Sequence, residues 1–321
     1  MKKLIDPFII ALLFMIALGW KYPNPALYDG WFSLDNLSEI GIALIFFLYG
    51  LKLSPAEMRK GMNNIKVHII VQASTFILFP LLVIAFFPFV KDSKLIWLAI
   101  FFLATLPSTV SSSVVMVAMA KGNIPPAIFN ASLSGLIGIF VTPLWIGLFI
   151  STTNIDFELS GILFSLFLKI VLPVIFGLLL NRIWGRLAQK HSKQLAIFDK
   201  AIILLIVYKS FSKSFNNNLF ETIPWIQLFI IATAVITLFA LVYTSIHLTS
   251  KWINLNRKDR ITALFCGSKK SLVHGTVMSS VLFKGMASQG LMLLPIMIYH
   301  AFQLVVISFI AQRMAKKIQS S

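Results

Sequence analysis

Long apolar runs alternate along the chain with short breaks rich in polar residues, proline or glycine. A helix needs about 20 residues to cross a bilayer core of about 30 Å, and most of these runs approach that length. Lipid offers no partner to the backbone, so only helices or closed barrels satisfy its N–H and C=O groups. The pattern predicts ten helical spans, at residues 4–20, 37–53, 66–90, 95–120, 125–150, 159–182, 198–212, 224–249, 261–283 and 290–313.

The composition agrees with this pattern. Of the 321 residues, 58% are apolar and only 12% are charged, against about 25% charged in soluble domains. The mean hydropathy is +0.88. These values disfavour a water-soluble enzyme and predict an all-α, multi-pass membrane protein whose main partner is the lipid bilayer.

The distribution of basic residues predicts an orientation. A net charge of +17 would suit a nucleic-acid partner, but the lysines and arginines lie in short clusters between apolar runs, so we expect none. A cytoplasmic N-terminus places 19 of the 28 basic residues on the inner side and six on the outer side. Basic residues favour the cytoplasmic side. Both termini are therefore predicted to be cytoplasmic, with the chain in the bacterial inner membrane.

An internal repeat is the most informative feature of the sequence. Sliding residues 107–123 onto 270–286, a constant offset of 163, aligns five identical pairs without a gap. The same offset carries the fourth span onto the ninth and the whole five-span pattern onto itself. Because five is odd, the second copy enters the membrane upside down. The sequence thus predicts two inverted repeats, residues 1–153 and 154–321.

Polar residues interrupt spans four and nine near their middles. Pro107 removes a helix hydrogen bond and Gly267 loosens a turn, so both stretches can unwind and free backbone groups at membrane depth. Matched broken helices point to the midplane site of a transporter. Close helix packing by small hydroxyl residues is the alternative. The candidate ligands of substrate or ion here are Ser108, Thr109, Ser111, Ser112, Ser113, Ser268 and Ser271.

Lys269 and Lys270 lie inside the ninth span. An ammonium group at the bilayer centre costs at least about 2.5 to 3.5 kcal/mol on insertion scales, so such groups persist where water or a partner meets them. The cores of spans four, five, nine and ten contain no carboxylate. We expect both lysines to face a polar cavity, where they hold an anionic substrate or occupy a place that a metal cation fills elsewhere. A misplaced span, with both at an interface, is the alternative.

Further polar side chains accompany the two breaks. Asn130 and Ser134, four residues apart on span five, share a helical face beside the first break. Helix packing is their alternative role. The remaining candidates are Gln72 on span three, Ser132 on span five, His274 after the second break, and Tyr299, His300 and Gln303 on span ten.

Other features limit the function. Glu39 is interpreted as an interfacial carboxylate, and Lys169, without an acidic neighbour along the sequence, is expected to reach a carbonyl freed by Pro173. The single cysteine, Cys266, permits no intrachain disulfide. His-Glu-x-x-His, Gly-x-Ser-x-Gly and phosphate-binding-loop motifs are absent, so no enzyme is expected.

Several of these motifs carry a family resemblance. They are the run from Ser111 to Asn123, Phe129-Asn-Ala-Ser132, Val141-Thr142-Pro143-Leu144, Gly267-Ser-Lys-Lys-Ser271 and Tyr299-His300. With the ten-span outline, they resemble the bile acid:sodium symporter family over nearly the whole chain. Three of these motifs resemble most closely its branch typified by sodium/bile acid cotransporter 7 and bacterial relatives. They are Phe129-Asn-Ala-Ser132, Gly267-Ser-Lys-Lys-Ser271 and Tyr299-His300.

The resemblance implies an architecture and a mechanism. A panel domain would comprise residues 4–53 and 159–212, and a core domain residues 66–150 and 224–313, with spans four and nine crossing at their unwound centres. A small organic anion, by default sterol-like and amphipathic, would bind between the domains, with sodium behind the crossing. Alternating access would move it across the membrane. The oligomeric state stays open.

The family's sodium sites carry over only in part. Ser113 and Gln72 match family ligand positions, but Val114 stands where the family has an asparagine, Ala127 and Ala131 fall near its hydroxyl positions, and residues 266–271 contain no carboxylate. No cofactor is expected other than Na⁺.

The lysines suggest a reason for these losses. Like charges about 4 Å apart repel by roughly 4 kcal/mol at an effective dielectric constant of 20. We therefore hypothesise that Lys269 or Lys270 supplies locally the charge that bound sodium would bring. Alternatives are a proton-coupled or uncoupled anion transporter, and a non-transporting regulator or receptor with the same fold.

Overall fold

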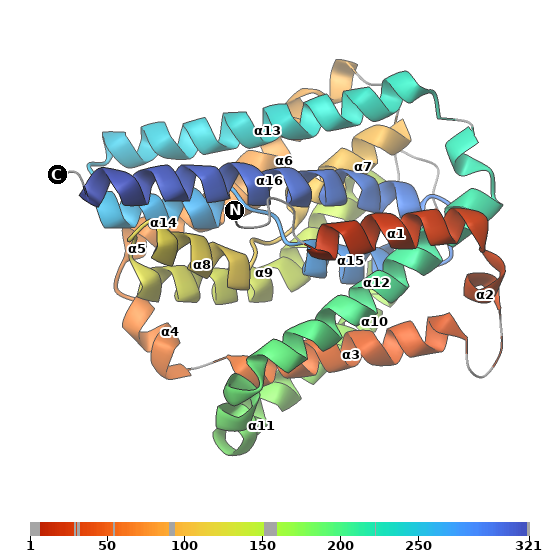
Figure 1. Cartoon of the computed structure of the whole chain (residues 1–321), viewed down its shortest axis with the longest axis horizontal. Helices are drawn as coiled ribbons and strands as arrows, with labels where there is room; N and C mark the ends of the chain where they lie inside the picture. The colour runs from red at the N-terminus through yellow and green to blue at the C-terminus, as the bar shows by residue number, and fades with distance from the viewer. Residues whose placement is uncertain are drawn as a thin grey trace. The chain divides into compact units, whose positions relative to one another are not determined.

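The computed structural model describes residues 7–28, 30, 33–53, 55–89, 94–150, 159–221 and 223–319, and all regular structure among them is helical. The predicted all-α class is confirmed for these residues. The helices (Figure 1) are α1 (Pro7–Lys21), α2 (Asn24–Leu27), α3 (Leu34–Lys52), α4 (Pro55–Gly61), α5 (Ile65–Ala73), η1 (Ser74–Leu78), α6 (Phe79–Ala85), η2 (Phe87–Phe89), α7 (Lys94–Thr105), α8 (Ser111–Met119), α9 (Ile124–Ile150), α10 (Leu159–Leu166), η5 (Phe167–Val171), α11 (Leu172–Lys190), α12 (Ser192–Asn216), η6 (Leu219–Glu221), α13 (Trp225–Trp252), α14 (Arg257–Gly267), α15 (Leu272–Leu282) and α16 (Gln289–Gln319).

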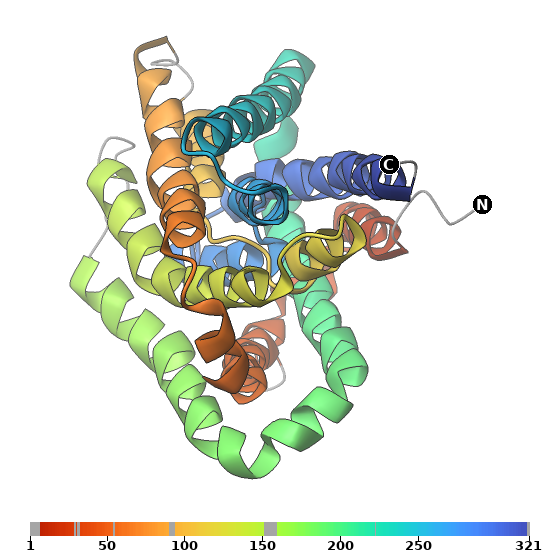
Figure 2. The ribbon, with the colours of Figure 1, turned by 90° about the vertical axis from the view of Figure 1, so that its left-hand side faces the viewer.

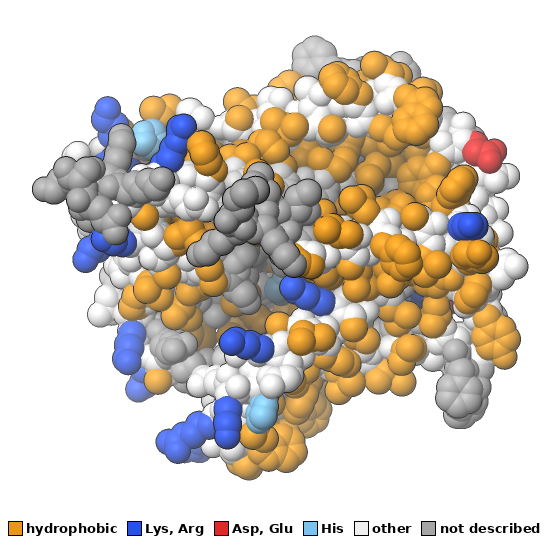
Figure 3. Space-filling model, in the orientation of Figure 1, with side chains coloured by type: hydrophobic (Ala, Val, Ile, Leu, Met, Phe, Trp, Pro, Cys, Tyr) orange, Lys and Arg blue, Asp and Glu red, His pale blue; other side chains and the backbone are white. Residues whose placement is uncertain are grey.

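Six helical stretches in the described part of the chain are long and apolar enough to cross a membrane. They are Leu34–Lys52, Ile65–Ala85, Ile124–Phe149, Phe164–Lys190, Trp225–Trp252 and Gln289–Ala315. Two shorter apolar helices, α1 and α7, accompany them. Figure 3 shows hydrophobic side chains along the exposed side of α13 and basic ones at its left-hand end. The ten-span order remains a prediction.

The chain divides into two compact units, which are described separately. The first unit comprises Met1–Ser54, Asp156–Trp225 and Gly275–Leu294. In it, α3 packs against α11, and α1 against α12. Figure 2 shows α11 and α12 meeting in a sharp turn.

Glycines allow α3 and α11 to approach closely. A Cβ atom on Gly177 would lie 2.0 Å from the carbonyl oxygen of Phe47, and one on Gly50 would lie 2.2 Å from that of Val174. Both contacts are with backbone, which cannot move aside alone. The two helices are therefore in backbone contact, as small residues permit at helix interfaces in membranes.

The second unit comprises Pro55–Ile155, Ile226–His274 and Pro295–Ser321. It contains both breaks expected from the sequence. Helix α7 ends at Thr105 and α8 begins at Ser111, whereas α14 ends at Gly267 and α15 begins at Leu272. Pro107 lacks the N–H that would continue the first helix, so the unwinding follows from the sequence.

A capping interaction fixes where α14 begins. The Asn256 side chain accepts a hydrogen bond from the backbone N–H of Asp259 (2.9 Å) and donates one to its Oδ2 (2.7 Å). The other oxygen of Asp259 accepts a bond from Asn123 Nδ2 (2.8 Å). The start of one broken helix pair is thereby joined to the loop that follows the other.

The structure differs from the expected spans in several places. The third and sixth spans each contain a π-helical turn, η1 and η5, and π-helical turns often occur at functional sites. The seventh span was predicted at 198–212, but α12 runs from 192 to 216. Its ends are polar, so hydropathy alone placed both limits too far inward.

Candidate functional site

The two breaks meet in the interior of the second unit. The backbone N–H of Ser271 donates a hydrogen bond to the carbonyl of Pro107 (2.9 Å), and Ser108 Oγ donates to the carbonyl of Cys266 (2.5 Å). The Ser108 N–H donates to Ser134 Oγ on α9 (2.9 Å). Ser108, Ser134 and Ser271 were predicted candidates, and the structure brings them together. We call residues 106–110 and 268–271 the crossing.

Lys270 binds three backbone carbonyls with its side chain. Its Nζ lies 2.8 Å from the carbonyl oxygen of Thr75, 2.6 Å from that of Ala104 and 2.7 Å from that of Leu106. Donating a hydrogen bond to each of three carbonyls requires three N–H groups. An ammonium group has three, whereas a neutral amine has only two. The geometry therefore indicates a charged lysine. The Phe79 ring centroid lies 4.0 Å from Nζ and adds a cation–π contact.

These carbonyls are free because the helices that contain them are interrupted. Ala104 lies in the last turn of α7, where carbonyls lack helical donors. Within the π-helical turn, Phe79 N–H bonds to Ser74 O, and Pro80 has no N–H to offer the carbonyl of Thr75. Pro80 and the end of α7 thus create the acceptors that Lys270 uses.

Lys269 binds hydroxyl groups of the first break. Its Nζ donates to Ser112 Oγ (2.9 Å), Ser112 donates to Thr109 Oγ1 (2.9 Å), and Thr109 bonds to Ser113 Oγ (2.7 Å). These hydrogen bonds connect four predicted candidates. The side chain of Ser111 lies outside the described side chains, although its backbone begins α8.

We expected both lysines to face a polar cavity, but the described part of the chain encloses their side chains. Lys269 is 0% exposed and Lys270 is 1% exposed. Three backbone carbonyls bind the Lys270 Nζ and one hydroxyl binds the Lys269 Nζ, and carbonyl oxygens carry no signal in a sequence. Of the two lysines, Lys270 is the one whose Nζ lies among carbonyl oxygens, as a bound metal cation would.

Helix α16 holds the second break in place. Gln303 accepts a bond from Lys270 N–H (2.9 Å) and donates one to Lys270 O (2.8 Å), and Tyr299 OH donates to Ser268 O (2.6 Å). His300 bonds to Gln303 through Nδ1 (3.0 Å). These side chains replace hydrogen bonds that the interrupted helix lacks.

Two other candidates make local bonds at the second break. Ser271 Oγ bonds to His274 Nδ1 (2.9 Å), and Ser268 Oγ donates to Leu264 O (2.6 Å). Both contacts fix the ends of α14 and α15. His274 is therefore a positioning group in this structure.

Gln72 and Asn130 form a second polar group. Gln72 Nε2 lies 3.1 Å from Asn130 Oδ1, and Asn130 Nδ2 lies 2.8 Å from Nδ1 of His68, which sequence reasoning missed. Gln72 Oε1 is buried and makes no hydrogen bond within the described part of the chain. Ser132 is buried on α9. A free, buried acceptor at Gln72 fits its predicted place in a cation site.

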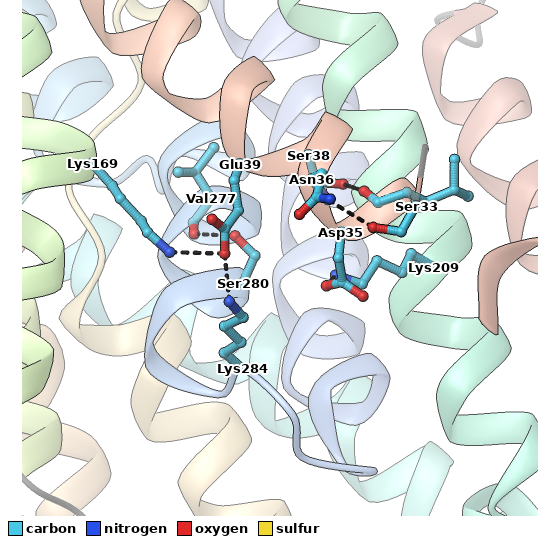
Figure 4. A network of polar contacts seen from close by, with 11 residues as sticks. Ser33, Asp35, Asn36, Ser38, Glu39, Lys169, Lys209, Val277, Ser280 and Lys284 are labelled. Atoms are coloured by element: carbon cyan, nitrogen blue, oxygen red, sulfur yellow. Dashed lines mark hydrogen bonds and ion pairs between the residues drawn. The ribbon is translucent and has the colours of Figure 1, made fainter. Parts of the chain in front are cut away.

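The first unit corrects the interpretation of Lys169. Its Nζ lies 2.8 Å from Glu39 Oε1, which also lies 2.5 Å from Lys284 Nζ (Figure 4). Lys169 therefore pairs with a carboxylate instead of a carbonyl freed by Pro173. The two residues are 130 positions apart, so no local pattern could connect them.

Other features of the described residues do not add a site. They contain no group of three His, Cys, Asp or Glu side chains able to hold a metal ion. A cleft of about 310 Å³ in the second unit is lined by α5, η1 and α13, and its lining is almost entirely apolar. It offers no charge to bind an anion.

Comparison with known proteins places the chain among transporters. Residues 6–316 match the family model described as the SBF-like CPA transporter family. The chain is similar to the uncharacterized protein PA2026 of Pseudomonas aeruginosa (36% identity, over 97% of this chain and 93% of that protein). It is also similar to the putative symporter YfeH of Escherichia coli (34%; 97% and 93%) and to sodium/bile acid cotransporter 7 of Danio rerio (27%; 93% and 90%).

Proposed function

Because the chain belongs to the SBF-like CPA transporter family, and is thus a multi-pass membrane transporter and not an enzyme, we propose that it moves a small organic anion by secondary active transport. The observation that carries this proposal is the crossing. Two broken helices, joined through Ser271 N–H and Pro107 O, bring hydroxyls and backbone groups without helical partners together inside one unit. Interrupted helices of this kind are how transporters build midplane sites.

The proposed architecture has ten spans in two inverted repeats, residues 1–153 and 154–321, within a panel and a core domain. The chain would lie in a bacterial inner membrane with both termini in the cytoplasm. Substrate would bind near the crossing, and alternating access would expose it to each side in turn.

The proposed substrate is a sterol-like amphipathic anion, since several relatives are named sodium/bile acid cotransporter 7. The most direct test is uptake of radiolabelled cholate by proteoliposomes, compared with empty liposomes. Accumulation driven by an imposed ion gradient supports a secondary transporter. Saturable cholate binding without any uptake would instead favour a receptor or regulator with this fold.

Coupling to sodium is a separate question, and Lys270 bears on it. We propose that its ammonium takes the place of a bound sodium ion. Backbone carbonyls are hard oxygen ligands of the kind that bind alkali cations, and three of them already surround Nζ at 2.6 to 2.8 Å. A second cation nearby would meet strong repulsion. Transport would then be proton-coupled or uncoupled.

The test removes the tethered charge. Purified Lys270→Ala should gain a saturable stabilisation by Na⁺ relative to choline, read as a shift in melting temperature, because the three carbonyls can accept a free cation. Lys269→Ala is the matched control, since the Lys269 Nζ binds the hydroxyl of Ser112 and does not share the three carbonyls that bind Lys270. Isothermal titration of the unmodified protein with sodium does not depend on any variant folding. Tight, saturable binding there would overturn the replacement.

A further inference from the structure

A charged cluster lies in the first unit, whereas the crossing belongs to the second. Glu39 of α3 meets Lys169 of the π-helical turn η5 and Lys284, which follows α15. One turn earlier on α3, Asp35 pairs with Lys209 of α12. Figure 4 shows Glu39 pointing toward Lys169 and Lys284, with Asp35 and Lys209 beside them. We call these five residues the lysine cluster.

The lysine cluster has more positive than negative charge. Three lysines face two carboxylates, and both Lys169 and Lys284 contact the same oxygen, Oε1 of Glu39. A partly enclosed group of side chains with a net positive charge attracts anions. The surplus of one charge matches a single monovalent anion.

The side of the lysine cluster formed by Glu39 and Lys284 is accessible, with 35% and 54% of these side chains exposed. Lys169 is 26% exposed, about as much as Lys52 (27%), which pairs with the less exposed Asp199 (17%) elsewhere in the same unit. A carboxylate that bridges two lysines and remains accessible can be displaced by another carboxylate. A purely structural ion pair needs neither the surplus charge nor the access.

We propose that Lys169 and Lys284 form a binding site for the carboxylate or sulfonate of the transported anion, and that Glu39 occupies this site when substrate is absent. The inference rests on the proposed function and assigns the charged end of the substrate to a place in the first unit. Glu39 is thus an internal competitor. Substrate can bind only when Glu39 has left the two lysines. The affinity for substrate therefore depends on the fraction of time that Glu39 is bound to them.

The two kinds of substitution have opposite expected effects. Glu39→Gln keeps the shape of the side chain but removes the competing charge. If Glu39 occupies the lysines about nine-tenths of the time, the variant binds about tenfold more tightly. Lys284→Gln and Lys169→Gln remove the attraction and should weaken binding by at least a similar factor. A structural salt bridge predicts no gain from Glu39→Gln.

The experiment measures binding of radiolabelled cholate to the full-length protein in phosphatidylcholine nanodiscs. Lys52→Gln is the matched control, because it breaks an ion pair in the same unit (3.2 Å) and should leave the affinity unchanged. Melting temperatures show which variants fold. If a lysine variant does not fold, the gain expected for Glu39→Gln still decides the matter.

Two outcomes overturn the proposal. The first is that Glu39→Gln binds cholate with the same affinity as the unmodified protein. If proteoliposomes still accumulate cholate in that case, the transport function stands and the lysine cluster has no part in it. The second is a response of these variants only to phosphatidylglycerol added to the nanodiscs, which would make the cluster a lipid headgroup site. Absence of both binding and uptake of cholate rejects this inference and the proposed substrate together.

Discussion

Gln303 illustrates how a single residue supports an interrupted helix. Its amide exchanges two hydrogen bonds with the backbone of Lys270, as a neighbouring strand would, and it is 0% exposed. Buried backbone groups left without partners cost about 1 to 3 kcal/mol each. The geometry of the second break therefore depends on one side chain of span ten.

We expect Gln303→Met to lower the free energy of unfolding by about 2 kcal/mol or more, because it strands one donor and one acceptor of Lys270. Equilibrium unfolding of detergent-solubilised protein with sodium dodecyl sulfate measures this change. Gln312→Met, on the same helix but with only a 3.5 Å contact to Ser308 at an exposed position, is the control and should be neutral. Equal losses in both variants would contradict the role of Gln303.

At this scale the sequence predicted side chains better than their partners. Ser108, Ser134 and Ser271 were expected at the crossing because hydroxyls and proline interrupt an apolar run. The carbonyls that bind Lys270 were not expected, since backbone oxygen is present at every position. His68 and the pairing of Glu39 with Lys169 were missed, because their partners lie 62 and 130 residues away.

At the scale of the elements, close contact between α3 and α11 gives the first unit its firmest junction. Gly177 lies against the carbonyl of Phe47, and Gly50 against that of Val174, so the backbones approach without intervening side chains. Gly41 on α3 differs, because a Cβ there would meet only the side chain of Ile202, at 2.6 Å. A side chain can turn aside, whereas a carbonyl within a helix cannot.

Gly177→Ala should therefore destabilise the protein by about 1 to 3 kcal/mol, the usual cost of overpacking. Gly41→Ala should cost less, since Ile202 can change rotamer. The comparison uses the midpoint of thermal aggregation for the two purified variants. A larger shift for Gly41→Ala than for Gly177→Ala would show that the two helices separate more easily than their contact suggests.

The ends of helices were predictable where the hydropathy of the sequence changes sharply. Where the hydropathy changes gradually, they were not. The breaks at Pro107 and Gly267 have chemical signals, and the structure confirms them. The π-helical turn at Ser74–Leu78 has only an indirect signal, Pro80, which the apolar run conceals. The polar ends of α12 extend beyond its apolar centre and were excluded from the predicted span.

At the scale of the whole molecule, the distribution of basic residues predicts which loops face the cytoplasm. The proposed topology places the turn between α11 and α12 inside and the segment after α12 outside. Lys193 and Asn217 are exposed representatives of these two places. The only native thiol, Cys266, is 0% exposed and should not react.

A membrane-impermeant maleimide should therefore label Asn217→Cys in right-side-out vesicles and label Lys193→Cys only after the vesicles are opened with detergent. The reason is the cytoplasmic preference of lysine and arginine. The unmodified protein serves as the unlabelled control. The reverse pattern would invert the whole orientation, and labelling of both variants before detergent would refute ten spans.

The anchoring of Lys270 limits how the transporter can work. One side chain from the ninth span holds the third and fourth spans through their carbonyls, and Gln303 of the tenth holds the same residue by its backbone. If the two broken helices separated at their crossing, the Lys270 ammonium and the three carbonyls that it binds would lose their hydrogen bonds inside the membrane. We therefore expect these four spans to travel as one block, so that a distance measured between spin labels on α8 and α14 stays constant throughout the cycle, and the hinges lie elsewhere.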